Sequence, residues 1–127
     1  MVNPLRILCI EDKQADFRLL ERHLQNNGLP ADCRRVDKLD ELRTELEQSR
    51  WDLVLADFNV PTVDFQETLD LLRPRLEELP LILVSGSVGE ERAVEMLKLG
   101  VWDFVVKDNL TRLVPAIEHG LRAVAER

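Results

Sequence analysis

Several polar side chains stand where apolar runs of this sequence end. Glu11 and Asp12 follow the run LRILCI, Asp57 follows LVLA, Ser85 lies in LILVSGS, and Lys107 closes VWDFVVK. Neighbouring carboxylates repel one another, and a hard divalent cation such as Mg²⁺ relieves that repulsion while leaving positions for water and phosphate oxygens. A carboxylate nucleophile, such a cation, a lysine and a hydroxyl donor together suit the formation of an aspartyl phosphate.

Each of these residues taken alone has an ordinary structural explanation. An aspartate such as Asp57 often caps a turn or a helix, and the pair Glu11 and Asp12 suits the positive N-terminal end of a following helix. Ser85 with Gly86 is typical of a turn, and a single lysine is usually a solvated surface charge. Their joint placement at the ends of apolar runs favours one shared site over coincidence.

The apolar runs alternate with amphipathic stretches. Strands are predicted at Leu5–Ile10, Ala31–Val36, Trp51–Ala56, Leu81–Ser87 and Val101–Lys107. Helices are predicted between and after them from the spacing of Phe17, Leu20 and Leu24, of Leu39, Leu42 and Leu46, of Leu69, Leu72 and Leu76, of Ala93, Val94 and Leu97, and of Leu110, Leu113, Val114, Ile117, Leu121 and Val124. Strict alternation predicts a doubly wound α/β fold with a parallel sheet, in which ligands bind beyond the carboxyl ends of the strands. The polar residues at those ends should therefore gather in one pocket.

Composition narrows the class of protein. The chain has 127 residues, which suits one domain over residues 1–127, and a formal net charge of −7. That charge argues against direct binding to nucleic acid or to an anionic membrane. No apolar segment reaches the roughly 18 residues of a membrane span, and the first residues lack the features of a signal peptide. Cys9 and Cys33 occur without metal-binding or redox spacing, so buried free thiols in a reducing, cytoplasmic setting are expected.

Four segments taken together resemble the receiver domain of bacterial two-component response regulators. They are ILCIED at the first strand, LVLADFNVP at the third, LILVSGS at the fourth and VWDFVVKDNL at the fifth. The resemblance extends over essentially the whole chain. It implies a flavodoxin-like (βα)5 fold whose five-stranded parallel sheet has the order 2-1-3-4-5.

The resemblance also implies a role for each residue of the expected pocket. Asp57 would accept a phosphoryl group from a phosphohistidine on a sensor histidine kinase or a histidine phosphotransfer protein. The side chains of Glu11, Asp12 and Asp57 would bind Mg²⁺, together with the backbone carbonyl of Asn59.

Further residues would respond to the phosphoryl group. Ser85 would donate a hydrogen bond to it and move toward it, and Lys107 would pair with it. Phe104 matches the aromatic switch position of the family, although core packing is an equal alternative for a strand aromatic. The face made by the fourth helix, fifth strand and fifth helix would then repack for a downstream protein target. The chain would act as a switch in a phosphorelay and would not be an enzyme, beyond assisting its own phosphorylation and dephosphorylation.

Three features depart from the family pattern. Glu11 stands where the family often has aspartate, so its longer side chain is expected to hold the metal through water. Asp108 stands where a proline usually follows the lysine, which puts a cis peptide bond there in doubt because a non-proline cis bond costs about 2.5–4 kcal/mol. The loop NVPTVDF lacks the glycine that is usual near Asp64 and Phe65, so its turn is expected to differ.

Two other functions fit parts of the pattern. DFNVPT resembles the motif of haloacid-dehalogenase-type phosphatases, but such enzymes place an acid two residues after the nucleophile, where this chain has Asn59. A receiver-like fold that is not phosphorylated and serves as a docking module is the third alternative. As a receiver, the chain would be a free-standing regulator, a relay intermediate or part of a hybrid histidine kinase. A monomer or a weak homodimer through the fourth and fifth helices is expected, with Trp102 either in that contact or turned inward.

Overall fold

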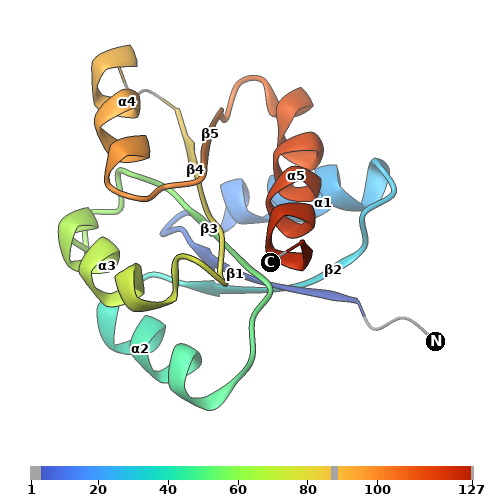
Figure 1. Ribbon diagram of the computed structural model, residues 1–127. Helices are drawn as coiled ribbons and strands as arrows, with labels where there is room; N and C mark the ends of the chain where they lie inside the picture. Colours follow the sequence, from blue (N-terminus) through green and yellow to red (C-terminus); the bar gives the residue numbers. More distant parts are fainter. Residues whose placement is uncertain (1–3, 87–88, 127) are drawn as a thin grey trace.

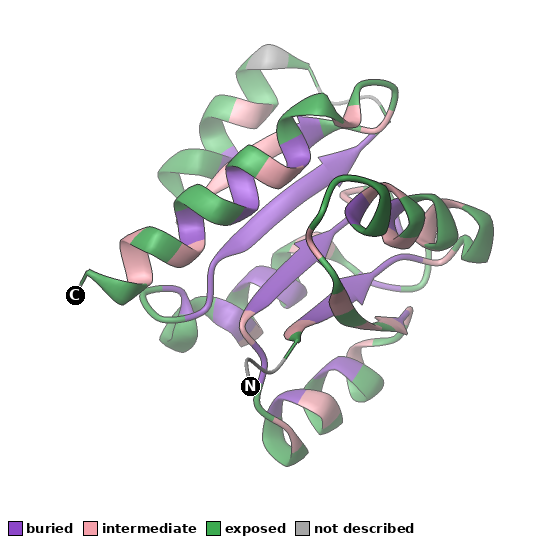
Figure 2. Cartoon of the chain, turned by 90° about the vertical axis from the view of Figure 1, so that its right-hand side faces the viewer, coloured by how far each residue is buried: buried purple, intermediate pink, exposed green. Residues whose placement is uncertain are grey.

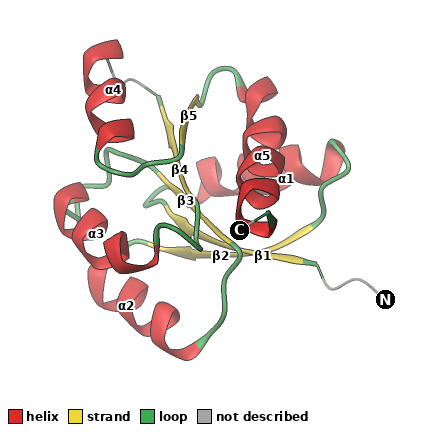
Figure 3. Ribbon diagram, in the orientation of Figure 1, coloured by secondary structure: helices red, strands yellow, loops and turns green. Residues whose placement is uncertain are grey.

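The computed structural model describes residues 4–86 and 89–126 and has three layers, a central sheet with helices on both faces (Figure 1). The strands are β1 (Leu5–Ile10), β2 (Ala31–Val36), β3 (Leu53–Ala56), β4 (Leu81–Ser85) and β5 (Asp103–Val106). The helices are α1 (Gln14–Asn26), α2 (Leu39–Gln48), α3 (Phe65–Leu72), α4 (Glu90–Lys98) and α5 (Leu113–Ala125), with 3-10 turns η1 (Arg73–Arg75) and η2 (Leu110–Arg112). Strands and helices alternate along the chain as predicted (Figure 3). Ser87, at the end of the predicted fourth strand, lies outside the described residues.

The five strands are parallel and lie in the order β2-β1-β3-β4-β5. Ile7 of β1 lies opposite Cys33 of β2 on one side and Leu53 of β3 on the other. The predicted fold and strand order are therefore confirmed. Because the strands are parallel, the residues that follow β1, β3, β4 and β5 lie at the same edge of the sheet.

The sheet buries its two faces against different helices, because successive strand residues point to opposite faces. Ile7 and Cys9 belong to the apolar cluster that includes residues of α1 and α5. Leu8 and Ile10 belong to the cluster that includes residues of α2, α3 and α4. Strands β3 and β4 are buried along their whole length (Figure 2). Continuous burial of this kind is typical of a parallel sheet covered on both faces.

The third helix is shorter than its apolar spacing predicts. Helix α3 ends at Leu72, and the chain continues through η1 to the buried Leu76. Pro74 within η1 has no backbone N–H to continue the α-helical hydrogen-bond pattern, which explains the change of helix type. At the other end, the Asp64 carboxylate accepts the Gln66 N–H at 2.9 Å and caps the helix in the absence of a glycine.

The apolar spacing located the fourth helix but not its buried face. Met96 is the buried apolar residue of α4, whereas Val94 and Leu97 are 45% and 44% exposed. The third strand begins later than predicted, because Trp51 precedes β3. The indole N–H of Trp51 donates to the Glu45 carbonyl oxygen at 3.0 Å. This bond ties the start of the strand to α2.

The turn between α4 and β5 packs closely on the segment after α3. Gly100 has φ +114°, and a Cβ atom placed there would lie 2.8 Å from Cδ1 of Leu76. The indole N–H of Trp102 donates to the Leu76 carbonyl oxygen at 2.7 Å. Trp102 was expected either in a dimer contact or turned inward. Its indole N–H is turned inward and binds the protein's own backbone.

The two thiols are free, with Cys9 buried and Cys33 half-buried. A hydrogen bond with the Cys33 thiol and burial raise the pKa of Cys9 well above its ordinary value. Its nucleophilic thiolate form is thus disfavoured. Within residues 4–86 and 89–126, no helix is both long enough and apolar enough to cross a membrane.

Replacement of Gly100 by alanine should lower the free energy of unfolding by about 2 kcal/mol, because the backbone conformation and the approach of Leu76 both oppose a side chain. Urea denaturation measures this. Gly86→Ala is the matched control, since no atom of the described residues beyond its chain neighbours lies within 4 Å of the added Cβ and its φ is not positive. Equal unfolding midpoints for the two variants would contradict the packing described for this turn.

Candidate functional site

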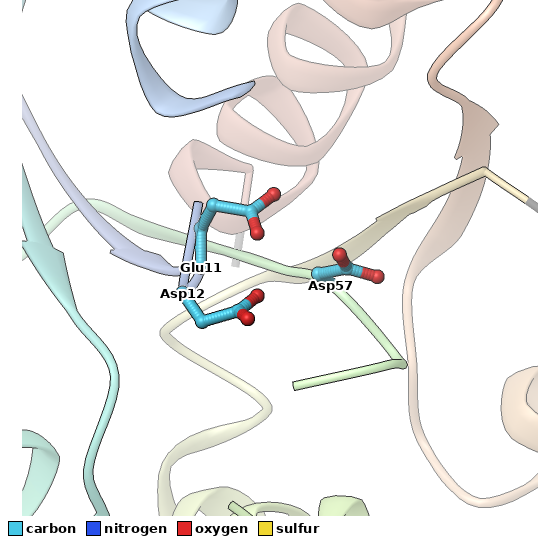
Figure 4. A group of neighbouring side chains, drawn as sticks. All are labelled: Glu11, Asp12 and Asp57. Atoms are coloured by element: carbon cyan, nitrogen blue, oxygen red, sulfur yellow. The ribbon is translucent and has the colours of Figure 1, made fainter. Parts of the chain in front are cut away.

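Three carboxylates meet at the carboxyl ends of β1 and β3. Glu11 and Asp12 follow β1 and Asp57 follows β3, and one carboxylate oxygen from each lies within 4.8 Å of the others. Figure 4 shows Glu11 and Asp12 side by side, with their carboxylates on the side that faces Asp57. Backbone hydrogen bonds fix their positions, from the Glu11 N–H to the Val36 carbonyl at 3.0 Å and from the Asp57 N–H to the Ile10 carbonyl at 2.9 Å.

Lys107 binds this cluster from the end of β5. Its Nζ lies 2.6 Å from Oε1 of Glu11, 2.7 Å from Oδ2 of Asp57 and 2.8 Å from Oδ2 of Asp16. The backbone N–H of Lys107 donates to the Ser85 carbonyl at 3.0 Å, which continues the β4–β5 pairing one residue past the strand. The structure thus brings Lys107 to the predicted carboxylates.

Electrostatics of the cluster follow from this arrangement. Burial of the ammonium lowers the pKa of Lys107, but the hydrogen bonds to Asp16, Asp57 and Glu11 outweigh burial and raise it above its ordinary value. Burial raises the pKa of Glu11, against hydrogen bonds from Lys107 and the Lys13 N–H that lower it. One ammonium faces more than one carboxylate, so the cluster favours an additional cation.

The hydrogen bonds of the carboxylate oxygens show which of them remains free to bind a metal. Oδ1 of Asp57 accepts the Asn59 N–H at 3.0 Å and Oδ2 accepts Lys107, while Oε2 of Glu11 accepts the Lys13 N–H at 3.2 Å. Oδ1 of Asp12 is buried and has no hydrogen-bond partner among the described residues. A buried, unpartnered carboxylate oxygen beside two further carboxylates fits a hard cation such as Mg²⁺.

The remaining predicted site residues occupy different environments. Ser85 ends β4, is fully buried, and its Oγ has no hydrogen-bond partner within the described part of the chain. Asn59 is exposed and bonds to Asp57 through its backbone. Phe104 is half-buried and packs against the cluster that α2, α3 and α4 cover. The described peptide bonds are all trans, including that between Lys107 and Asp108.

Two residues that the sequence interpretation did not single out support the cluster. Asp16 lies in the first turn of α1 and bonds to Lys107, and the guanidinium of Arg35 donates to the Glu11 carbonyl oxygen at 3.2 Å. The available signal for Asp16 was an acid in the first turn of a helix that begins at the pocket. For Arg35 the signal was its position near the end of the strand that neighbours β1.

A larger hollow lies at the opposite edge of the molecule. It has a volume of about 520 Å³ and is lined by Leu46, Trp51, Leu79, Leu121 and further residues of η1, of α5 and of the loops that follow α2 and η1. The carboxylate cluster, by contrast, combines an unpartnered carboxylate oxygen of Asp12 with the Lys107 ammonium. We therefore place the candidate site at the cluster, where the groups suited to chemistry converge.

Solved structures share this fold. A signal receiver domain from Vibrio parahaemolyticus has a TM-score of 0.83 at 23% identity, covering 98% of this chain and 95% of that one. A CheY-like response regulator receiver domain protein from Methanospirillum hungatei has a TM-score of 0.80 at 21% identity, covering 98% of each chain. At this level of identity the likeness concerns the fold.

Comparisons of sequence, unlike the likeness in fold alone, identify relatives of this chain. The response regulator protein FleR of Pseudomonas aeruginosa is 30% identical over 102 residues, and the phosphate regulon transcriptional regulatory protein PhoB of Rhizobium meliloti is 32% identical over 104. Each alignment covers 80% of this chain, but only 21% of FleR and 45% of PhoB. A family model described as "Response regulator receiver domain" matches residues 7–118. The chain belongs to the response regulator receiver domain family.

Proposed function

We propose that this chain is a phosphoryl-accepting switch of a two-component system and that Asp57 is the acceptor. The observation that carries the proposal is the Asp57 carboxylate bound to the Lys107 ammonium at 2.7 Å, next to Glu11 and Asp12. Family membership supports the same assignment. The phosphoryl donor would be a phosphohistidine of a sensor histidine kinase or of a histidine phosphotransfer protein.

The transfer step can be written for the residues present. A carboxylate oxygen of Asp57 attacks phosphorus, the P–N bond of the phosphohistidine breaks as the new P–O bond forms, and the imidazole leaves with the electron pair of that bond. Lys107 donates N–H bonds to the phosphoryl oxygens in place of one it gives to Asp57. The buried Ser85 hydroxyl, which lacks a partner in the described structure, supplies a further donor.

The site would hold Mg²⁺ through oxygen ligands of this chain. Asp12 and Asp57 would bind directly and the Asn59 backbone carbonyl would add a ligand, while Glu11, which has the longer side chain, would act through water. When bound, Mg²⁺ neutralises the carboxylates and polarises the phosphoryl group. Two residues of the chain would assist the transfer. Lys107 would orient the phosphoryl donor, and the buried Ser85 would limit the access of water to the site.

The proposed readout lies on α4, β5 and α5. Phe58, next to Asp57, packs on Phe65 with ring centroids 5.1 Å apart, and the Arg92 guanidinium of α4 lies 5.0 Å from the Phe58 ring centroid. A phosphoryl group adds nearly two negative charges beside this contact and so biases the position of α4. A downstream protein target would recognise the changed face, with this chain a monomer or a weak homodimer. The switch needs no enzymatic turnover by this chain.

Incubation with acetyl phosphate and Mg²⁺ should add the mass of one phosphoryl group to the protein, and Asp57→Asn should abolish that addition because it removes the nucleophile. Intact mass spectrometry measures both. Asp108, the exposed residue after Lys107, provides the matched control. The Asp108→Asn variant should be labelled to the same extent as the wild type. Failure of the wild type to label at any Mg²⁺ concentration would favour a docking module. Asp57-dependent turnover of p-nitrophenyl phosphate would favour a phosphatase.

Asp12→Asn should have opposite effects on metal binding and on stability. Because Asp12 would supply an oxygen that has no hydrogen-bond partner, its loss should weaken Mg²⁺ binding about tenfold or more. NMR titration with Mg²⁺ measures this. Loss of a half-buried carboxylate with one buried, unpartnered oxygen should raise the free energy of unfolding in EDTA by about 1 kcal/mol, measured with urea. Asp108→Asn should change neither quantity. A lower stability of Asp12→Asn in EDTA would show that the Asp12 carboxylate has a stabilising partner.

A further inference from the structure

We infer that Asp16 is a positioning residue for phosphoryl transfer, an inference that rests on the function proposed above. Its role would be to hold the Lys107 ammonium in place while the other carboxylates engage metal and phosphate. Asp16 lies in the first turn of α1, 91 residues from Lys107 in sequence, with Oδ2 2.8 Å from Nζ. Its side chain is 29% exposed, and that of Lys107 is 18% exposed.

The lysine has three N–H donors, and each finds one carboxylate. The acceptors are Glu11 after β1, Asp57 after β3 and Asp16 in α1, at 2.6, 2.7 and 2.8 Å. An ammonium held from three elements cannot turn without breaking a charge-assisted hydrogen bond. In this structure the orientation of the Lys107 ammonium is therefore fixed.

Phosphorylation and metal binding together engage two of these three acceptors. Asp57 loses carboxylate character when one of its oxygens bonds to phosphorus, and Glu11 belongs to the group of carboxylates suited to a cation. Among the described residues that group contains Glu11, Asp12 and Asp57 but does not contain Asp16. Asp16 is therefore the one of the three acceptors whose bond to Lys107 does not compete with the proposed metal or with the new covalent bond.

The space around Lys107 makes such an anchor consequential. A cavity of about 40 Å³ is lined by Asp16, Leu19, Leu20, Lys107 and Leu110. That volume admits a water molecule and leaves room for the lysine head group to shift. A flexible four-carbon side chain that loses its anchor would sample this space instead of the phosphoryl position. Small displacements of a positioning group slow a transfer step substantially.

A purely structural role for Asp16 is the competing explanation, because an acid in the first turn of a helix interacts favourably with the helix dipole. Glu67 occupies the equivalent place in the first turn of α3. Glu67→Gln therefore removes the same dipole interaction from a different helix and is the matched control for Asp16→Asn.

The experiment measures the maximal rate of Asp57 labelling at acetyl phosphate and Mg²⁺ concentrations that saturate each variant. Asp16→Asn should lower this rate about tenfold, as expected for loss of an orienting partner. Glu67→Gln should stay within about twofold of the wild type, and Asp16→Glu should recover part of the rate because it restores a carboxylate. Urea denaturation establishes that each variant is folded.

A second readout does not depend on transfer. In ¹⁵N NMR spectra of the Lys107 Nζ–H group, with Mg²⁺ and beryllofluoride as phosphoryl mimic, a protected signal should persist in the wild type and in Glu67→Gln and disappear in Asp16→Asn. Wild-type rate and signal in Asp16→Asn, or equal slowing in Glu67→Gln, would overturn the role of Asp16 while leaving Asp57 as acceptor. Absence of labelling in the wild type would instead overturn the proposed function.

Discussion

The attraction between one ammonium and several carboxylates organises this end of the molecule. Lys107 joins residues that follow β1 and β3 and a residue of α1, and Glu11 within this group is only 2% exposed. Charges withdrawn from water interact strongly, and removing the single cation would leave its partners uncompensated. The surplus of carboxylates over ammonium also means that the protein folds with repulsion still present at its site. The proposed affinity for a cation and a phosphoryl group would thus depend on the same charges that limit stability.

The sheet supplies the rigidity that such an arrangement needs. Hydrogen bonds continue past the strand ends, from the Asp57 N–H to the Ile10 carbonyl and from the Lys107 N–H to the Ser85 carbonyl. A site supported by paired backbone keeps its geometry better than one on free loops. The least embedded neighbour is α4, whose Val94 and Leu97 face solvent. A rigid site beside a helix that is only lightly buried suits a protein in which a change of charge at the site alters the surface.

The alternation of apolar strands with helical periods predicted a parallel sheet with helices on both faces, whereas the strand order was predicted from the resemblance to receiver domains. The sequence also predicted that Glu11, Asp12 and Lys107 would meet Asp57, since parallel strands end at one edge. It did not predict Asp16, because a first-turn acid is a common helix feature and its contact spans 91 residues. Nor did apolar spacing show that Met96, not Val94, is buried, since that depends on how α4 lies on the sheet. The end of α3 at Leu72 was foreseeable only as a disturbance by Pro74.

Both tryptophans stand at the far ends of the strands from the charged cluster. Trp51 precedes β3 and Trp102 precedes β5, whereas Asp57 and Lys107 follow them. At about 3.3 Å per strand residue, each indole is roughly 15–20 Å from those groups along the strand. Intrinsic fluorescence of this protein consequently reports on its unfolding. A spectral change on adding a phosphodonor would signal motion transmitted across the sheet, and not quenching at the aspartate.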